Sequence, residues 1–189
     1  MKKIIFTAAA VIAFLSISAQ TTYTENWPNG TKKVEGMTIG DAKAASTGTK
    51  AEQSRKMEGV VKDGKWTTWF ENGSVHSEEY YNKGTMTGVW KAVYENGQTE
   101  LEINFETGKA VYYTKNGVKS SEGGIASGML HTGTWTGYYE NGNKNYEGSY
   151  NAKGEKDGVW TWYDEKGNAT ARQNYSNGNL QNANDFIKK

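Results

Sequence analysis

Six glutamates recur once per repeat of the sequence, and they are the first residues whose type and spacing could carry chemistry. Two carboxylates that face each other across a glycosidic bond can catalyse its hydrolysis. In the hairpins predicted below, however, these glutamates stand opposite threonine, lysine or valine, so cross-strand hydrogen bonds and ion pairs explain them more simply. We therefore predict no enzyme, while a hydrolase would need one glutamate in a closed pocket with a raised pKa. The column consists of Glu35, Glu58, Glu78, Glu102, Glu122 and Glu147.

The other residues that bind metals or act as nucleophiles form no recognisable set. The sequence has no cysteine and only two histidines, His76 and His131, which lie in different repeats without a second ligand at metal spacing. Serines and threonines are plentiful, but neither a Gly-x-Ser-x-Gly motif nor a phosphate-binding glycine loop accompanies them. The sequence therefore predicts no catalytic residue, no metal site and no cofactor.

These side chains are positioned by a sequence repeat. The glycines that begin its successive copies lie 20 to 25 residues apart. Each copy has Gly-x-Trp, then an aromatic residue and a turn that is usually Asn-Gly, and one worn copy has Ala110 in the tryptophan position. An Asn-Gly pair between two alternating runs is a strong signal for a β-hairpin. The columns that define the repeat are the tryptophans Trp66, Trp90, Trp135 and Trp160 and the turn glycines Gly73, Gly97, Gly117, Gly142 and Gly167.

The stretch from Gly88 to Phe105 is the best-preserved copy of the repeat. Its hydrophobic residues alternate on both sides of Asn96-Gly97, which we predict to be a two-residue turn. Because side chains alternate along a strand, one face of this hairpin is apolar and aromatic and the other is mostly polar. The predicted pairs are Glu95–Gln98, Tyr94–Thr99, Ala92–Leu101, Lys91–Glu102 and Trp90–Ile103.

Hairpins that repeat without helices predict an all-β fold, an elongated array of antiparallel β-hairpins in a single curled sheet. A lone hairpin is marginal in water, so each unit depends on its neighbours for stability. The aromatic columns are large enough to form the core. We predict about seven units over residues 20–178, with a degenerate unit at 40–63. A C-terminal tail at 179–189 follows, and it can cover the exposed edge of the last hairpin.

The first 19 residues have the features of a secretory signal peptide. Lys2 and Lys3 precede an apolar run from Ile4 to Ile17, and small residues come before Gln20. The run is shorter than the roughly 20 residues that a membrane-spanning helix needs. Its removal leaves 20 basic and 21 acidic residues, and this balance favours neither nucleic acid nor an anionic membrane as a partner. We expect an exported chain, periplasmic or extracellular, with no transmembrane segment in its mature form.

The repeat resembles the MORN repeat (membrane occupation and recognition nexus), most closely its bacterial variant. The resemblance rests on the Gly-x-Trp-x-x-aromatic motif, the Asn-Gly turn, the following glutamate and a further aromatic residue, and it runs from about Tyr23 to Gly178. It implies an elongated array of hairpins used as an interaction scaffold. Some similar bacterial proteins are labelled antitoxins, so the resemblance also implies an alternative function as an antitoxin-like or immunity-like partner of a toxin.

A second aromatic column lies on the predicted polar face, about one ring per hairpin. Cross-strand packing on a solvated sheet would explain it. Alternatively, the rings stack on an extended ligand such as a glycan or a peptide. We predict an exported scaffold that binds protein or peptide through its aromatic face or an edge strand, with cell-envelope lipid or polysaccharide as alternative ligands. The candidate stacking residues are Trp69, Tyr80, Tyr113, Tyr138 and Tyr163.

Overall fold

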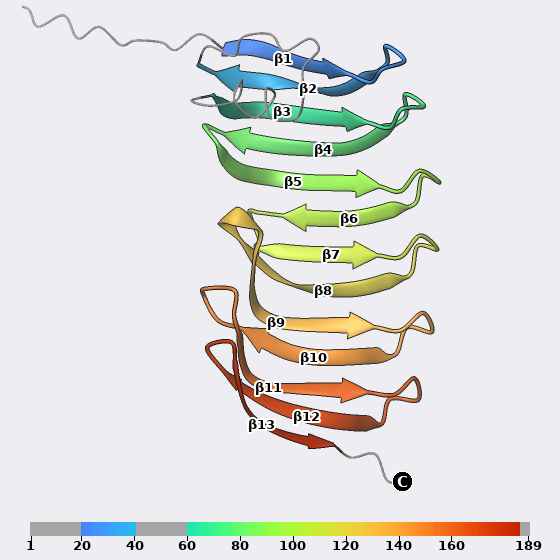
Figure 1. Ribbon diagram of the computed structural model, residues 1–189, viewed down its shortest axis with the longest axis vertical. Helices are drawn as coiled ribbons and strands as arrows, with labels where there is room; N and C mark the ends of the chain where they lie inside the picture. Colours follow the sequence, from blue (N-terminus) through green and yellow to red (C-terminus); the bar gives the residue numbers. More distant parts are fainter. Residues whose placement is uncertain (1–19, 41–59, 186–189) are drawn as a thin grey trace, which may run out of the picture.

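The chain forms one antiparallel sheet of thirteen strands, which the computed structural model describes over residues 20–40 and 60–185 (Figure 1). Strands that are neighbours in the sheet are also neighbours in the sequence. This arrangement confirms the predicted all-β array of antiparallel hairpins. The elements are β1 (Gln20–Asn26), β2 (Lys32–Ile39), β3 (Val61–Trp69), β4 (Val75–Asn82), β5 (Thr85–Val93), β6 (Thr99–Asn104), β7 (Lys109–Tyr113), β8 (Lys119–Ala126), the short 3-10 helix η1 (Ser127–Met129), β9 (Leu130–Tyr138), β10 (Lys144–Tyr150), β11 (Lys156–Tyr163), β12 (Ala169–Ser176) and β13 (Asn179–Asp185).

The predicted signal peptide and most of the predicted degenerate unit lie outside the described residues, so these boundaries stay predictions. Among the described residues, no helix is long and apolar enough to cross a membrane. The first part of the predicted tail forms β13, which pairs along β12 and is itself the edge of the sheet. Phe186 and Ile187 lie outside the described residues.

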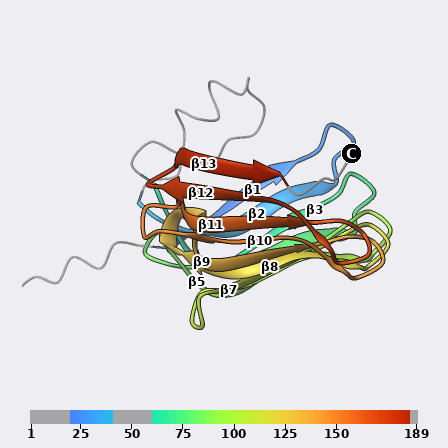
Figure 2. The same cartoon turned by 90° about the horizontal axis from the view of Figure 1, so that it is seen from below.

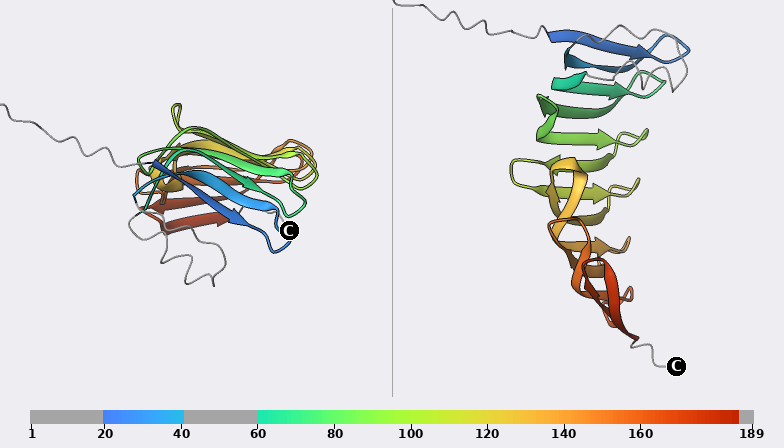
Figure 3. Two further views of the ribbon diagram at one scale, coloured as in Figure 1. Left: turned by 90° about the horizontal axis from the view of Figure 1, so that it is seen from above. Right: turned by 60° about the vertical axis from the view of Figure 1, so that its left-hand side comes forward.

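The sheet is long, curved and twisted. The hairpin turns follow one of its long edges, and the links between hairpins follow the other (Figure 1). Its strands bend when viewed along the long axis (Figure 2), and their direction rotates from β1 to β13 (Figure 3). The right-handed twist of each strand accumulates along an open sheet in this way. The result is a single curled sheet with one aromatic face.

Each hairpin turn is one residue longer than the sequence predicts. In the hairpin of β5 and β6, the Tyr94 N–H donates to the Gln98 carbonyl at 2.8 Å, and the Gly97 N–H donates to the Tyr94 carbonyl at 2.9 Å. Gly97 has a φ of 82°, which completes a three-residue loop with a left-handed last residue. The predicted two-residue turn is therefore wrong. The same two hydrogen bonds occur at 27–31, 70–74, 94–98, 114–118, 139–143 and 164–168.

A β-bulge after each turn cancels the extra residue. In the same hairpin, Val93 pairs with Thr99 while Ala92 pairs with Leu101, so Glu100 has no residue opposite it on β5. The predicted pairs Tyr94–Thr99 and Glu95–Gln98 are wrong, because Tyr94 lies opposite Gln98 and Glu95 is in the loop. The pairs beyond the bulge, including Lys91–Glu102, are as predicted. A bulge adds one residue to one strand of a pair. The unpaired residues of the six hairpins are Lys33, His76, Glu100, Ser120, Asn145 and Thr170.

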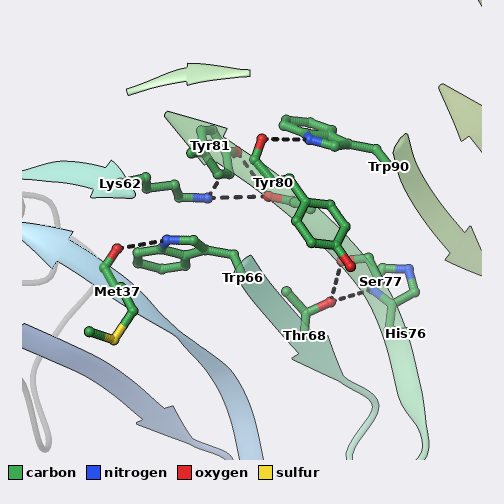
Figure 4. Close-up of polar contacts among 10 residues, drawn as sticks. Met37, Lys62, Trp66, Thr68, His76, Ser77, Tyr80, Tyr81 and Trp90 are labelled. Atoms are coloured by element: carbon green, nitrogen blue, oxygen red, sulfur yellow. Dashed lines mark hydrogen bonds and ion pairs between the residues drawn. The ribbon is translucent and has the colours of Figure 1, made fainter. Parts of the chain in front are cut away.

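The largest side chains of the core are four tryptophans, each of which packs on the preceding strand. Trp66 is only 2% exposed, and its indole N–H donates to the Met37 carbonyl at 2.9 Å (Figure 4). Trp90, Trp135 and Trp160 make the same kind of bond, to the carbonyls of Tyr80, Gly124 and Ser149. All the strands belong to one sheet, so these rings are buried by neighbouring side chains and backbone rather than by a second layer of strands.

Glycine makes room for three of the four rings. A Cβ atom at Gly36, Gly123 or Gly148 would lie 2.1 to 2.4 Å from the indole of the tryptophan that covers it. Such a distance is far inside van der Waals contact, so only glycine fits. The worn copy of the repeat shows the reverse exchange, because Ile103 pairs with Ala110 and both are fully buried.

A candidate binding groove on the tryptophan face

The five predicted stacking residues occupy different settings and are all partly buried. The Trp69 ring has the Lys32 ammonium 5.6 Å from its centre, and Tyr138 donates to Glu122. Tyr80 lies against the backbone at Gly88, while Tyr113 and Tyr163 each accept a hydrogen bond at their backbone carbonyls. Their role in stacking on a ligand stays a prediction.

Glu122 is the centre of a polar cluster on the polar face. Its carboxylate accepts from the Tyr138 hydroxyl at 2.7 Å and lies 3.0 Å from the Lys119 Nζ and 3.2 Å from the Lys109 Nζ. The hydrogen bond from Tyr138 and the two lysines lower the pKa of Glu122 to about 2. Burial and the neighbouring carboxylate raise the pKa of Tyr138 to about 12. The cluster ties three hairpin strands together, β7, β8 and β9.

We expect Glu122→Gln to lower the free energy of unfolding by about 1 kcal/mol at neutral pH, since solvent screens this partly exposed carboxylate. The pKa of Glu122 is lower in the folded state than its ordinary value of 4.5, so its stabilising effect is full above that pH. The effect is lost as the pH falls towards about 2. Urea unfolding of the wild-type protein and of Glu122→Gln, from neutral pH down to about pH 2, should show the difference in their free energies of unfolding shrink to nothing. A difference that stays constant with pH would contradict the assignment.

The described glutamates of the column form ion pairs with lysines on the surface of the sheet. Glu78, Glu102 and Glu147 lie opposite Thr67, Lys91 and Thr136, as predicted, and Lys91 and Glu102 are 3.2 Å apart. Lys65 pairs with Glu78, and Lys144 with Glu147. Glu122 is the least exposed of the paired glutamates in this column at 22%, yet its pKa is lowered, which is the opposite of what a general acid needs.

A groove lies on the turn side between the hairpins β3–β4 and β5–β6. A cavity of about 500 Å³ is lined by aromatic side chains and by charged groups from both hairpins and from the turn after β7. The rings of Phe70 and His76 are 4.6 Å apart, and His76 shares a hydrogen bond with Thr68 (Figure 4). The His76 Nε2 is 3.7 Å from the Glu100 carboxylate. The lining residues are Phe70, His76, Val93, Tyr94, Glu95, Asn96, Glu100 and Lys115.

A second, more apolar cavity of about 290 Å³ shares His76 and Glu100 with the first. Trp90, Leu101 and Ile103 supply its apolar wall. Met129 of η1 also lines it, although η1 follows β8 in the chain. The two cavities therefore form one groove that leads from the charged turn edge to the tryptophan face.

The groove opens where hairpins are not tied at their turns. Trp27 donates to the Trp69 carbonyl at 3.0 Å, which joins the first hairpin to the second. Tyr94 likewise donates to the Tyr113 carbonyl at 2.7 Å, joining the third to the fourth. The equivalent residue of the second hairpin is Phe70, which has no polar side-chain atom to donate. Pairing between β4 and β5 ends at Ser77 and Ala92, the position at which pairing also ends at the other junctions between hairpins, so only side chains can close the space beyond it.

His131 also belongs to the aromatic face rather than to a metal site. Its ring stacks on Trp135 with centres 3.8 Å apart and meets Tyr150 edge-on at 5.1 Å. Burial lowers the pKa of His131. Within the described residues, no group of three or more metal-ligating side chains comes together.

Sequence reasoning missed most of the groove residues. His76 and Glu100 are bulge residues of two different hairpins. With a two-residue turn, each of them would have had a pairing partner on the other strand of its own hairpin. Phe70 and Tyr94 come directly before the turn loops, in a column that also holds Trp27 and Tyr139. The aromatic character of that column is visible in the sequence and could have pointed to the turn edge. The residues of this column that are not hydrogen-bonding rings, among them Phe70 and Thr114, were visible as well.

Comparison with known protein families agrees with this architecture. The family model described as MORN repeat variant matches the chain four times, at residues 62–83, 86–107, 132–152 and 156–177. Each match covers one hairpin, and together they cover β3 to β6 and β9 to β12, whereas the hairpin of β7 and β8 is not matched. A search of curated proteins finds no match.

Proposed function

Because the chain belongs to the MORN-repeat family, we propose that it is an exported, non-enzymatic scaffold that binds protein or peptide through its tryptophan face. The observation that carries the proposal is the absence of a second layer over this face. Among the described elements, only η1 lies outside the sheet, so a row of half-buried aromatic rings faces outward. These rings belong to Tyr81, Phe105, Tyr112 and Tyr150.

Rings of this kind suit a macromolecular partner. Aromatic residues contribute large apolar contact areas, and they are enriched at the energetic centres of protein interfaces. A sheet whose apolar face has no covering layer gains stability when a partner removes that face from water. The N-terminal apolar run supports export, because it has the length and flanking charges of a signal peptide.

Photocrosslinking in the native host tests this function. A benzophenone amino acid is placed at Tyr112, on the tryptophan face, or at Tyr113, the next residue, whose side chain points to the opposite face. We expect Tyr112 to give a discrete crosslinked species outside the cytoplasm, identified by mass spectrometry, and Tyr113 to give none. Crosslinks from Tyr113 alone would assign binding to the polar-face aromatic column instead. Crosslinks from neither position would contradict the scaffold function.

A further inference from the structure

We propose that the groove between the hairpins β3–β4 and β5–β6 binds an extended peptide segment in which a large apolar side chain and a basic one lie two residues apart. The inference rests on the proposed scaffold function and names the site and the chemistry of its partner. The apolar side chain lies against Trp90 and Met129, and the basic side chain faces the carboxylates at the turn edge.

The apolar half of the groove has the size and lining for one side chain. Its volume of about 290 Å³ is at the lower end of small-molecule pockets, which span roughly 300–1,000 Å³. Trp90, Leu101 and Ile103 form the wall, and Met129 reaches over from η1. Met129 has a φ of 63°, a conformation that is uncommon outside glycine, so this residue is held in place by the fold around it. Methionine adapts readily to apolar side chains of different shapes.

The turn half of the groove favours a cation. Two carboxylates, Glu95 and Glu100, line it, and among the described residues neither of them forms a salt bridge with a lysine or an arginine. Glu100 lies 3.7 Å from the Nε2 of His76. One lysine lines this half, Lys115, whose ammonium lies 5.9 Å from the centre of the Tyr94 ring. The other half is also lined by Lys91, which lies 3.2 Å from the Glu102 carboxylate. The carboxylates of the turn half thus outnumber its permanent cation, and the aromatic rings of Phe70 and Tyr94 offer further favourable contacts to a basic side chain.

The site depends on features that the other hairpins lack. The bulge positions equivalent to His76 and Glu100 are Lys33, Ser120, Asn145 and Thr170, so an adjacent histidine and glutamate occur only at this junction among the described hairpins. The ring hydrogen bond that ties the turn of one hairpin to the next is missing here, because Phe70 has no donor, and also after the fourth hairpin, where Thr114 holds the equivalent position. The pair of His76 and Glu100 is therefore what distinguishes this junction. The groove is therefore a specific site within the array and not a property of every repeat.

Fluorescence anisotropy with designed peptides tests the proposal. The probe is a short fluorescein-labelled peptide with a Leu-Thr-Arg centre, which places leucine and arginine on the same side of an extended chain. Control peptides carry glutamate in place of arginine or serine in place of leucine. We expect the wild-type protein to bind the Leu-Thr-Arg peptide about tenfold more tightly than either control, which corresponds to about 1.4 kcal/mol.

Variants of the protein identify the site. Glu100→Lys is expected to reverse the preference, so that the glutamate peptide binds more tightly, and the milder Glu100→Gln is expected to abolish the preference for arginine. Glu106→Lys makes the same change of charge at an exposed position outside the groove and is expected to leave the preference unchanged.

Three outcomes would overturn the proposal: equal affinities for the three peptides, no binding of any peptide, or equal effects of Glu100→Lys and Glu106→Lys. The scaffold function is judged separately by crosslinking at Tyr112. If the peptides fail while Tyr112 still crosslinks, the assignment of this groove is lost and the scaffold function stands. If Tyr112 also fails, both are lost.

Discussion

Gly123→Ile is expected to lower the free energy of unfolding by about 3 kcal/mol, because a side chain at this position collides with Trp135. A Cβ atom there would be 2.4 Å from the indole. The ring, which is 2% exposed, must then leave its place and lose both its burial and its hydrogen bond to the Gly124 carbonyl. Overpacking of this kind costs roughly 1–3 kcal/mol, and a lost hydrogen bond adds about 1 kcal/mol.

The chain itself suggests a compensating change. Ile103 and Ala110 occupy the positions that glycine and tryptophan hold elsewhere, and both are fully buried. We therefore expect the double variant Gly123→Ile/Trp135→Ala to be about 2 kcal/mol more stable than the sum of the single effects predicts, which a double-mutant cycle in urea measures. Gly142→Ala is the control, since a Cβ there meets nothing within 4 Å and only the left-handed φ adds a cost of about 1 kcal/mol. Additive single effects would refute this packing account.

Trp66→Ala is expected to detach the first hairpin from the rest of the array. Trp66 holds β3 against the first hairpin by stacking on Tyr23 of β1 at 5.6 Å and by its hydrogen bond to the Met37 carbonyl of β2. Truncating a buried tryptophan costs about 3–5 kcal/mol. In a linear array such a loss acts mainly on the neighbouring interface, and the affected unit lies at the end of the sheet.

Hydrogen exchange followed by mass spectrometry can locate this effect. In Trp66→Ala, the amides of β1 and β2 should lose protection while those of β9 to β12 keep it. The matched variant Trp135→Ala lies in the middle of the array and should weaken strands on both of its sides. Equal loss of protection along the whole chain in both variants would mean that the sheet unfolds as one unit.

Much of the fold follows from sequence periodicity. The Gly-x-Trp and Asn-Gly columns locate every hairpin between Val61 and Ser176, and the cross-strand pair Lys91–Glu102 is found as predicted. The prediction fails at the turns because a dipeptide signal cannot distinguish a two-residue loop from a three-residue loop that is followed by a bulge. Both give the same pairing beyond the bulge, so the alternation of apolar residues is the same in the two cases.

The candidate site could be predicted only in part. Aromatic rings on a sheet without helices pointed to a binding scaffold, and the family match agrees with that. The sequence did not reveal which rings line a groove, since this depends on whether adjacent hairpins are tied at their turns. The difference between Phe70 and Tyr94 is one hydroxyl group, and its effect is evident only once the Tyr94 oxygen is seen to reach the Tyr113 carbonyl.

The sequence by itself determined the unit, its period and the division of each hairpin into an apolar and a polar face, because these depend on local alternation and turn chemistry. Only the tertiary structure decided how the units meet. Tryptophan packs on the preceding strand and, at three of the four positions, requires glycine there. The bulges of two neighbouring hairpins place His76 and Glu100 in the lining of the same groove. Both effects depend on contacts between residues that are far apart in the chain, which local pattern does not encode.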